Sequence, residues 1–142
     1  MIETPSAYVS LIEEDVLLII AKDGIIIDIP QMWENYNATI KLNPAGDFPV
    51  IFEPEGYVSI TQEARELAAT KEMAKESCAM AIMVNNMAMR IFANFYMKIN
   101  KPPRPTRTFT NRKDAIAFCK EEYRKYLANK KALSAQKNMM VF

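Results

Sequence analysis

Three short apolar runs constrain the fold of this chain more than any other feature of its sequence. They are VLLIIA at 16–21, VIF at 50–52 and AMAIMV at 79–84. A strand that is apolar at consecutive positions, rather than at alternate ones, is typical of a sheet covered on both faces. Helices usually connect the strands of such a sheet, so the runs predict an α/β protein.

The segments around these runs have the patterns of a hairpin, of helices and of one more strand. YVSLIE at 8–13 alternates with period two, and the polar turn EED joins it to 16–21, which predicts a hairpin. Helices are predicted in 28–43, 59–77, 84–99 and 111–127, with Asp28 and Asn111 as caps of the first and the last, and a strand in 106–109. The order β-β-α-β-α-β-α-β-α is typical of a sandwich with a mixed sheet of about five strands and about four helices.

A chain of 142 residues suits a single domain with one core. We expect one domain over 1–142 with its core in 7–127. The remaining residues, 128–142, form a basic and then apolar C-terminal extension. This extension either continues the last helix and packs on a partner chain or frays.

Several residue types that catalytic and metal sites need are missing or scarce. There is no histidine, which excludes Ser-His and Cys-His nucleophile pairs and histidine metal ligands. Two separated cysteines cannot form a structural zinc site alone, and three glycines cannot build a phosphate-binding loop. The acids at 13–15 suit a hairpin turn better than acid/base chemistry. We therefore expect no enzyme activity, no metal and no cofactor.

The sequence also favours a cytoplasmic location. No apolar run approaches the ~18 residues of a membrane span, so we expect no integral membrane contact. The N-terminus lacks the basic start and apolar core of a secretion signal. Cys78 and Cys119 lie in apolar-periodic segments, as buried free thiols do in a reducing compartment.

Charge is distributed unevenly along the chain. Residues 1–76 hold 14 acids and 5 bases, whereas 77–142 hold 3 acids and 13 bases. The halves either neutralise each other, within the fold or between subunits, or the basic half binds an acidic partner. The basic interaction surface would comprise Lys98, Lys101, Arg104, Arg107, Arg112 and Lys113. The alternative is a solvated face, and no nucleic-acid motif is present, so we expect no nucleic acid partner.

The segment KPPRP at 101–105 stops the preceding helix near Asn100, because proline cannot continue it. We expect an ordered connection to the strand 106–109, which should lie at or near a sheet edge so that Arg107 reaches water or an acidic residue of the N-terminal half. We also expect the cations of this segment to share one face with Arg112 and Lys113.

The helix 84–99 is expected to turn one apolar face toward the core, comprising Val84, Met87, Ala88, Ile91, Phe92, Phe95 and Ile99. Methionines cluster on and around this helix, at Met80, Met83, Met87, Met89 and Met97. They either pack in the core or line a pocket for a small apolar ligand.

Three stretches resemble a known superfamily: the hairpin YVSLIEEDVLLIIA, the segment TQEARELAA, and AIMVNNMAMRIFANFYMKINKPPRPTRTFTNRKDAIAF. Over about residues 7–127 the chain resembles the STAS-like superfamily, and within it a SpoIIAA-like bacterial group. The resemblance implies a SpoIIAA-like α/β sandwich. Well-studied members are partner-switching regulators, in which a kinase phosphorylates a serine of an Asp-Ser-Ser-Gly-like stretch.

The matching stretch here, GYVSITQEA, lacks the Asp-Ser-Ser-Gly pattern but has two hydroxyls, Ser59 and Thr61. Either residue could cap the following helix, and both are candidate phosphoacceptors, since a phosphate gains from a helix N-terminus. We expect a non-enzymatic STAS-like regulatory or protein-interaction module whose partner is another protein or a second copy. The alternative is a carrier or sensor of a small apolar ligand or lipid.

Overall fold

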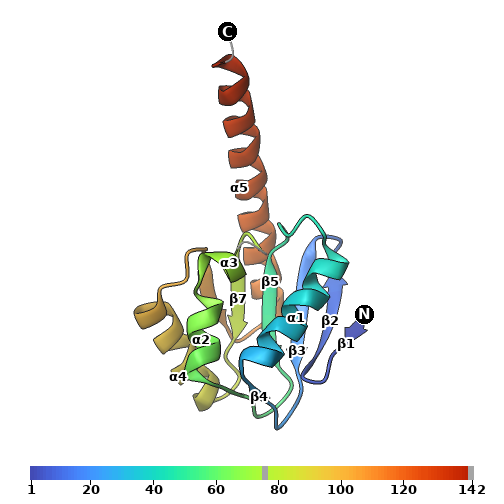
Figure 1. Ribbon diagram of the computed structural model, residues 1–142, viewed down its shortest axis with the longest axis vertical. Helices are drawn as coiled ribbons and strands as arrows, with labels where there is room; N and C mark the ends of the chain where they lie inside the picture. The colour runs from blue at the N-terminus through green and yellow to red at the C-terminus, as the bar shows by residue number, and fades with distance from the viewer. Residues whose placement is uncertain (75–76, 141–142) are drawn as a thin grey trace.

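The protein is an α/β fold built on a mixed sheet of six strands, seen in a computed structural model that describes residues 1–74 and 77–140 (Figure 1). The strand order is β1-β2-β3-β5-β7-β8. These strands are β1 (Ile2–Glu3), β2 (Ala7–Ile12), β3 (Val16–Ala21), β5 (Val50–Pro54), β7 (Met80–Met83) and β8 (Thr106–Phe109). The first three strands pair antiparallel and the last four pair parallel, so the mixed sheet is confirmed. Five strands were expected, and the additional one is β1, which pairs with β2 at the edge of the hairpin.

Two short strands and the helices complete the fold. The strands β4 (Ile26–Ile27) and β6 (Ser59–Ile60) form a separate parallel pair. The helices are α1 (Ile29–Leu42), α2 (Gln62–Ala68), α3 (Lys71–Ala74), α4 (Met87–Phe95), its π-helical continuation η1 (Tyr96–Asn100), and α5 (Arg112–Met139).

The helix expected over 59–77 is instead divided. Its first two residues form β6, and a break at Ala69 and Thr70 separates α2 from α3. The Thr70 hydroxyl donates to the Leu67 carbonyl at 2.7 Å and accepts from the Met73 amide at 3.3 Å, so it ends one helix and starts the next. The expected continuation through 75–76 lies outside the described residues.

Helices cover the sheet on both faces, as the apolar runs predict. Leu17 and Ile19 of β3 face the α1 side, with Val50 of β5. The alternate residues of the same strands face α5 and pack against it in a core cluster of Val16, Leu18, Ile51, Ala81, Met83, Ala115 and Cys119. A strand whose neighbouring residues are all buried must be apolar throughout, which explains the VLLIIA run.

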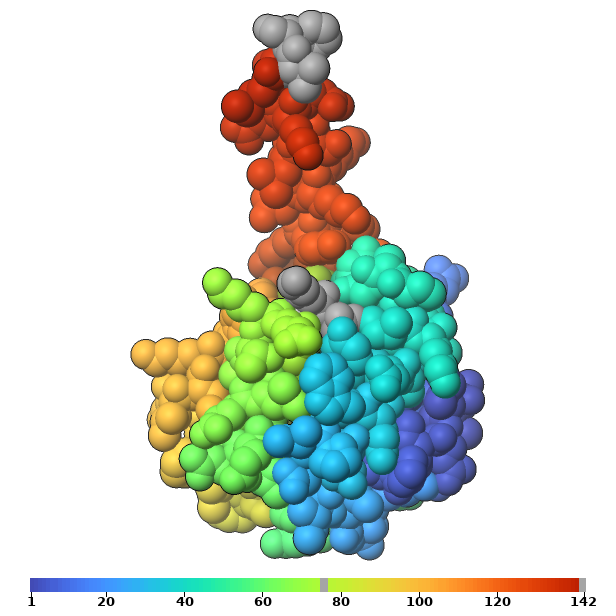
Figure 2. Space-filling model, in the orientation of Figure 1, coloured from blue at the N-terminus to red at the C-terminus, as the bar shows by residue number. Residues whose placement is uncertain are grey.

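Helix α5 is longer than the predicted helix over 111–127. Asn111 caps its start, as expected, by accepting from the amides of Lys113 at 2.7 Å and Asp114 at 3.3 Å. Its first turns pack on the sheet, whereas every residue from 127 to 140 is exposed. The second half of α5 therefore stands away from the body of the molecule (Figures 1 and 2). The extension continues the last helix through Met139, and 141–142 lie outside the described residues.

The proline-rich connection leads to the sheet edge, as expected. The helix ends at Asn100, and Lys101 follows in the left-handed region with φ of 49°. Strand β8 pairs with β7 alone and is an edge strand. Arg107 is exposed there, and its guanidinium lies 5.3 Å from the ring centroid of Phe109 and 5.6 Å from that of Phe118. Aromatic faces and water thus accommodate this cation without an acidic partner.

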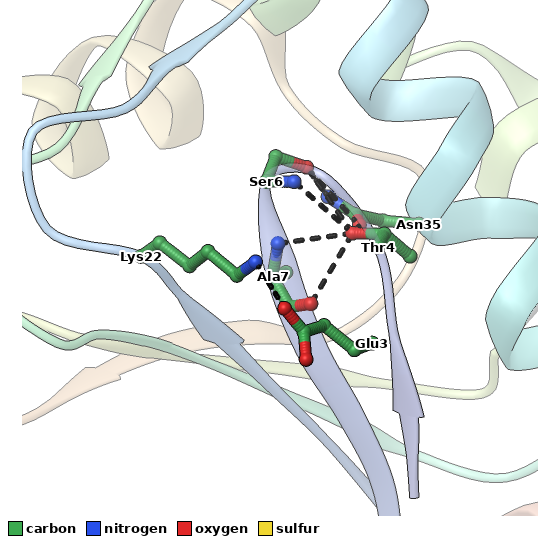
Figure 3. Close-up of polar contacts among 6 residues, drawn as sticks. All are labelled: Glu3, Thr4, Ser6, Ala7, Lys22 and Asn35. Atoms are coloured by element: carbon green, nitrogen blue, oxygen red, sulfur yellow. Dashed lines mark hydrogen bonds and ion pairs between the residues drawn. The ribbon is translucent and has the colours of Figure 1, made fainter.

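A buried polar network ties the N-terminus to α1 (Figure 3). Thr4 and Ser6 donate to Asn35 Oδ1 at 2.9 and 3.3 Å, and Asn35 Nδ2 donates to Ser6 Oγ at 3.1 Å. Thr4 Oγ1 also accepts from the Ala7 amide at 2.9 Å. Beside the network, Lys22 forms an ion pair of 2.7 Å with Glu3. The network sets the register in which β1 turns back onto β2.

Replacing Asn35 tests this network. Asn35→Ala leaves buried hydroxyls without their partner, which costs about 1–3 kcal/mol of unfolding free energy. Asn37→Ala is the matched control, because Asn37 is exposed on the same helix. Urea unfolding of both variants measures the difference, and equal midpoints would show that the network contributes nothing.

Candidate functional site

Helices α1 and α2 begin next to each other, after the parallel pair β4 and β6. Asp28 caps α1 by accepting from the Ile29 amide at 2.8 Å, and Gln31 completes a capping box. Thr61 caps α2 by accepting from the Ala64 amide at 3.1 Å. The Thr61 hydroxyl donates to Asp28 Oδ1 at 2.9 Å, which joins the two caps. This hydroxyl is therefore committed to holding both helix starts in place.

Ser59 has a different position from Thr61, although only one residue separates them. It lies in β6 and is half-buried, and it does not cap the helix. Within residues 1–74 and 77–140 its hydroxyl makes no hydrogen bond. Ser59 lines a surface groove of about 260 Å³. The groove, called the α4 groove below, is lined by Val58, Ser59, Ile60, Arg65, Ala88, Ile91, Phe92 and Phe95.

Helix α4 presents apolar side chains to water along the outer side of this groove. The exposed fractions are 69% for Met87, 52% for Ile91, 45% for Phe95 and 63% for Ile99. The buried side chains of the helix are instead Met89, Ala93 and Tyr96. The core face expected from the sequence is thus wrong for Met87, Ile91, Phe95 and Ile99. The segment is apolar on two sides, and periodicity alone could not show which side packs against the core.

Arg65 joins α2 to the end of this helix. Its Nε donates to Asn100 Oδ1 at 2.7 Å, and its guanidinium lies 5.4 Å from the centroid of the Phe95 ring. The contact places a half-buried cation in the wall of the α4 groove. The sequence analysis missed Arg65, which stands in the acidic half of the chain and shows no local signal.

The six cations expected to form one surface are divided between the two faces of the sheet. Arg104 turns toward the α1 and α2 side, where its Nη1 donates to Ser77 Oγ at 2.6 Å and its side chain lines an interior cavity. Arg107 lies on the α5 side. Arg112 binds Glu53 through two hydrogen bonds, the Nε–Oε1 one being 3.0 Å. Lys98, Lys101 and Lys113 are exposed. The expectation of one continuous face is therefore wrong for Arg104.

The acidic and basic halves of the chain meet within the fold. The Arg112–Glu53 pair and the Lys120–Glu13 pair, at 3.2 Å, each join residues 1–76 to 77–142. Part of the charge asymmetry is therefore neutralised inside one chain.

The interior on the α1 and α2 side holds two small apolar cavities. They measure about 80 and about 50 Å³ and share Ile27, Met32, Phe52, Ala68 and Met80 as lining residues. Pockets for small molecules usually measure about 300–1,000 Å³. Met32 and Met80 thus fill space between helices and sheet, which is how methionine commonly packs in cores.

Residues 1–74 and 77–140 do not meet the requirements of a metal site or of a membrane span. No cluster of three or more Cys, Asp or Glu residues suited to a metal ion is found there. The same residues contain no helix with the length and apolar character needed to cross a bilayer. Both cysteines are free, and burial raises the pKa of the Cys78 thiol and of the Cys119 thiol to about 12.

One family model matches most of this chain. The family described as "Domain of unknown function (DUF7793)" matches residues 10–123, from the hairpin to the middle of α5. The chain belongs to the DUF7793 family. Neither comparison with curated proteins nor comparison with solved structures gives a match. The DUF7793 match covers the α4 groove and both helix caps and leaves the exposed residues 127–140 of α5 outside.

The different positions of Thr61 and Ser59 predict different effects on stability. Thr61→Ala removes a cap and a hydrogen bond to Asp28, so we expect a loss of about 1 kcal/mol of unfolding free energy. Ser59→Ala removes a hydroxyl that has no hydrogen-bond partner in the described part of the chain and should change stability by less than about 0.5 kcal/mol. Chemical denaturation measures both, and an equal effect of the two substitutions would contradict the assignment of Thr61 as the cap.

The thiols should be unreactive in the folded protein. Only the thiolate reacts, and a pKa of about 12 leaves little of it near pH 8. We expect alkylation at pH 8 to be slower by about a hundredfold or more than in the protein unfolded by guanidinium. Mass spectrometry follows the labelling, and rapid native labelling of either cysteine would show that its thiol is accessible.

Proposed function

We propose that this DUF7793 chain is a non-enzymatic STAS-like regulatory module that acts through protein contacts, in a pathway of the partner-switching type. The observation that carries the proposal is the position of Ser59. Among residues 1–74 and 77–140 its hydroxyl has no hydrogen-bond partner, and Ser59 lines a groove whose outer wall is the exposed apolar side of α4. A hydroxyl that is accessible beside an apolar surface can change what binds there when it is modified.

The order of elements supports the resemblance to the STAS-like superfamily. A hairpin, β2 and β3, precedes α1 and the third long strand β5, and Ser59 then stands just before α2. This is the place that the phosphorylated serine has in partner-switching regulators. Because unrelated functions share folds of this class, the proposal depends on the groove rather than on the fold.

The electrostatics favour Ser59 over Thr61 as the modified residue. A phosphate on Ser59 would enter a groove that also contains the Arg65 side chain, which can bind phosphate oxygens. A phosphate on Thr61 would instead meet the Asp28 carboxylate, now 2.9 Å from the Thr61 hydroxyl, and would break two helix caps. Modification of Ser59 thus changes the surface while the fold stays intact.

The proposal includes a cytoplasmic location and a partner that is another protein or a second copy of this chain. Two free thiols, one half-buried at Cys78 and one buried at Cys119, suit a reducing compartment. Charge pairing between the halves of one chain lowers the need for a second copy to neutralise them. The apolar-ligand carrier gains no comparable support, since the interior cavities hold about 80 and about 50 Å³.

Affinity capture from the native cell, with quantitative mass spectrometry, tests the proposal. We expect the intact chain to recover a specific protein partner reproducibly and Ser59→Asp to change the amount recovered. Ser134→Asp is the matched control, because Ser134 is exposed on the part of α5 that leaves the body. Recovery of no partner would count against the interaction module. If Ser59→Asp and Ser134→Asp recover equal amounts of the partner, the proposed regulatory switch at Ser59 is contradicted.

A further inference from the structure

The outer side of α4 and η1 is an apolar stripe that none of the residues 1–74 and 77–140 covers. Met87, Ile91, Phe95 and Ile99 follow one another at intervals of four residues and are 45–69% exposed. Tyr57 is also exposed, at 64%, and Asn86 donates to the neighbouring Gly56 carbonyl at 3.4 Å, which brings this loop to the start of α4. An apolar surface of this extent on a folded domain usually marks a binding site.

The charges beside this stripe are positive. Arg90 and Lys98 are exposed on the same helical segment, Lys101 follows its end, and Arg65 stands in the opposite wall of the groove. Residues 77–113 contain seven cations and no acid. On the facing side, Glu63 and Glu66 are exposed on α2, and Glu66 accepts from Gln62 at 3.0 Å. Because Arg90, Lys98 and Lys101 lie on the α4 side, this side of the groove attracts acidic groups.

We propose that the α4 groove and the apolar stripe bind an acidic amphipathic helix of a partner protein, an inference that rests on the proposed function as an interaction module. The partner would place apolar side chains against Ile91 and Phe95 and carboxylates near Arg90 and Lys98. Helices bind grooves in this way through residues at positions i, i+3, i+4 and i+7.

The dimensions of the surface suit a helix. From Met87 to Ile99 the stripe is about 18 Å long at the rise of a helix, which corresponds to a little over three turns. An added strand would find little to pair with, because β6, the strand in the groove, has two residues. The groove is also concave, with a volume of about 260 Å³, which fits a helix better than a flat bilayer surface.

The exposed half of α5 from a second copy does not have the required charge. Residues 123–142 contain five cations and no acid, so they would meet Arg90 and Lys98 with charges of the same sign. An acidic helix is the occupant that satisfies both the apolar stripe and the cations.

Binding of synthetic peptides to the full chain tests the inference. The probes are two helix-stapled peptides of about 14 residues, or roughly four turns. Both have leucines at i, i+3, i+7 and i+10, and the remaining positions are mainly glutamate in one peptide and lysine in the other. Fluorescence anisotropy should show the acidic peptide binding more tightly, with a difference that decreases as salt is raised.

Variants locate the bound peptide. Ile91→Asp should weaken binding of the acidic peptide by about tenfold or more, as loss of a central apolar contact does. Leu133→Asp is its control, since Leu133 is 64% exposed on α5 away from the groove. Arg90→Glu should weaken binding and reduce its salt dependence, with Lys137→Glu as the control. All four residues are exposed, and thermal unfolding verifies that each variant is folded.

Other outcomes overturn the inference. These are equal binding of the acidic and basic peptides, binding insensitive to Ile91→Asp, or Ile91-dependent binding of phosphatidylserine vesicles in place of the peptide. Concentration-dependent dimerisation that Ile91→Asp abolishes would assign the stripe to a second copy. If cellular capture recovers a partner equally well with Ile91→Asp and the intact chain, the interaction module stands and this surface assignment fails.

Discussion

Burial of the central strands on both faces is the constraint on which the rest of the structure depends. Strand β3 cannot be stable unless helices cover its two sides, since neither Leu17 nor Leu18 can face water without cost. The parallel connections provide α1 and α2 for one face, and α5 covers the other. Charged residues of the parallel strands are tolerated at the sheet edge, where Arg107 lies exposed on β8.

The starts of α1 and α2 show how this arrangement produces a candidate site. The pairing of β4 with β6 aligns two chain segments that are about thirty residues apart, and both then enter a helix. Asp28 and Thr61 satisfy the free amides of the helix starts and hydrogen-bond to each other. Because Thr61 performs this role, Ser59 is left unengaged at the surface. A structural requirement at one hydroxyl thus leaves its neighbour without a role in the helix start.

Much of the local structure could be predicted because it depends on neighbours in the sequence. The caps at Asp28 and Asn111 depend on contacts within three residues, and both are confirmed. The prolines 102, 103 and 105 cannot continue a helix beyond its first turn, and the helix does end at Asn100. The division of 59–77 was not predicted, since β6 forms only through its partner β4 and the hydroxyl of Thr70 competes with helix continuation.

The sequence by itself determined the class of the fold, the order of its long strands, and those helix ends that caps and prolines set, such as the starts of α1 and α5 and the end at Asn100, because short apolar runs, caps and prolines act locally. Only the tertiary structure decided which side of α4 is buried. Met89 and Ile91 are equally apolar, and the approach of β7 and α2 buries the first and leaves the second exposed. It likewise decided that Arg104 turns inward to Ser77 while Arg107 stays at the surface. These choices depend on contacts between segments far apart in the chain, which no local pattern records.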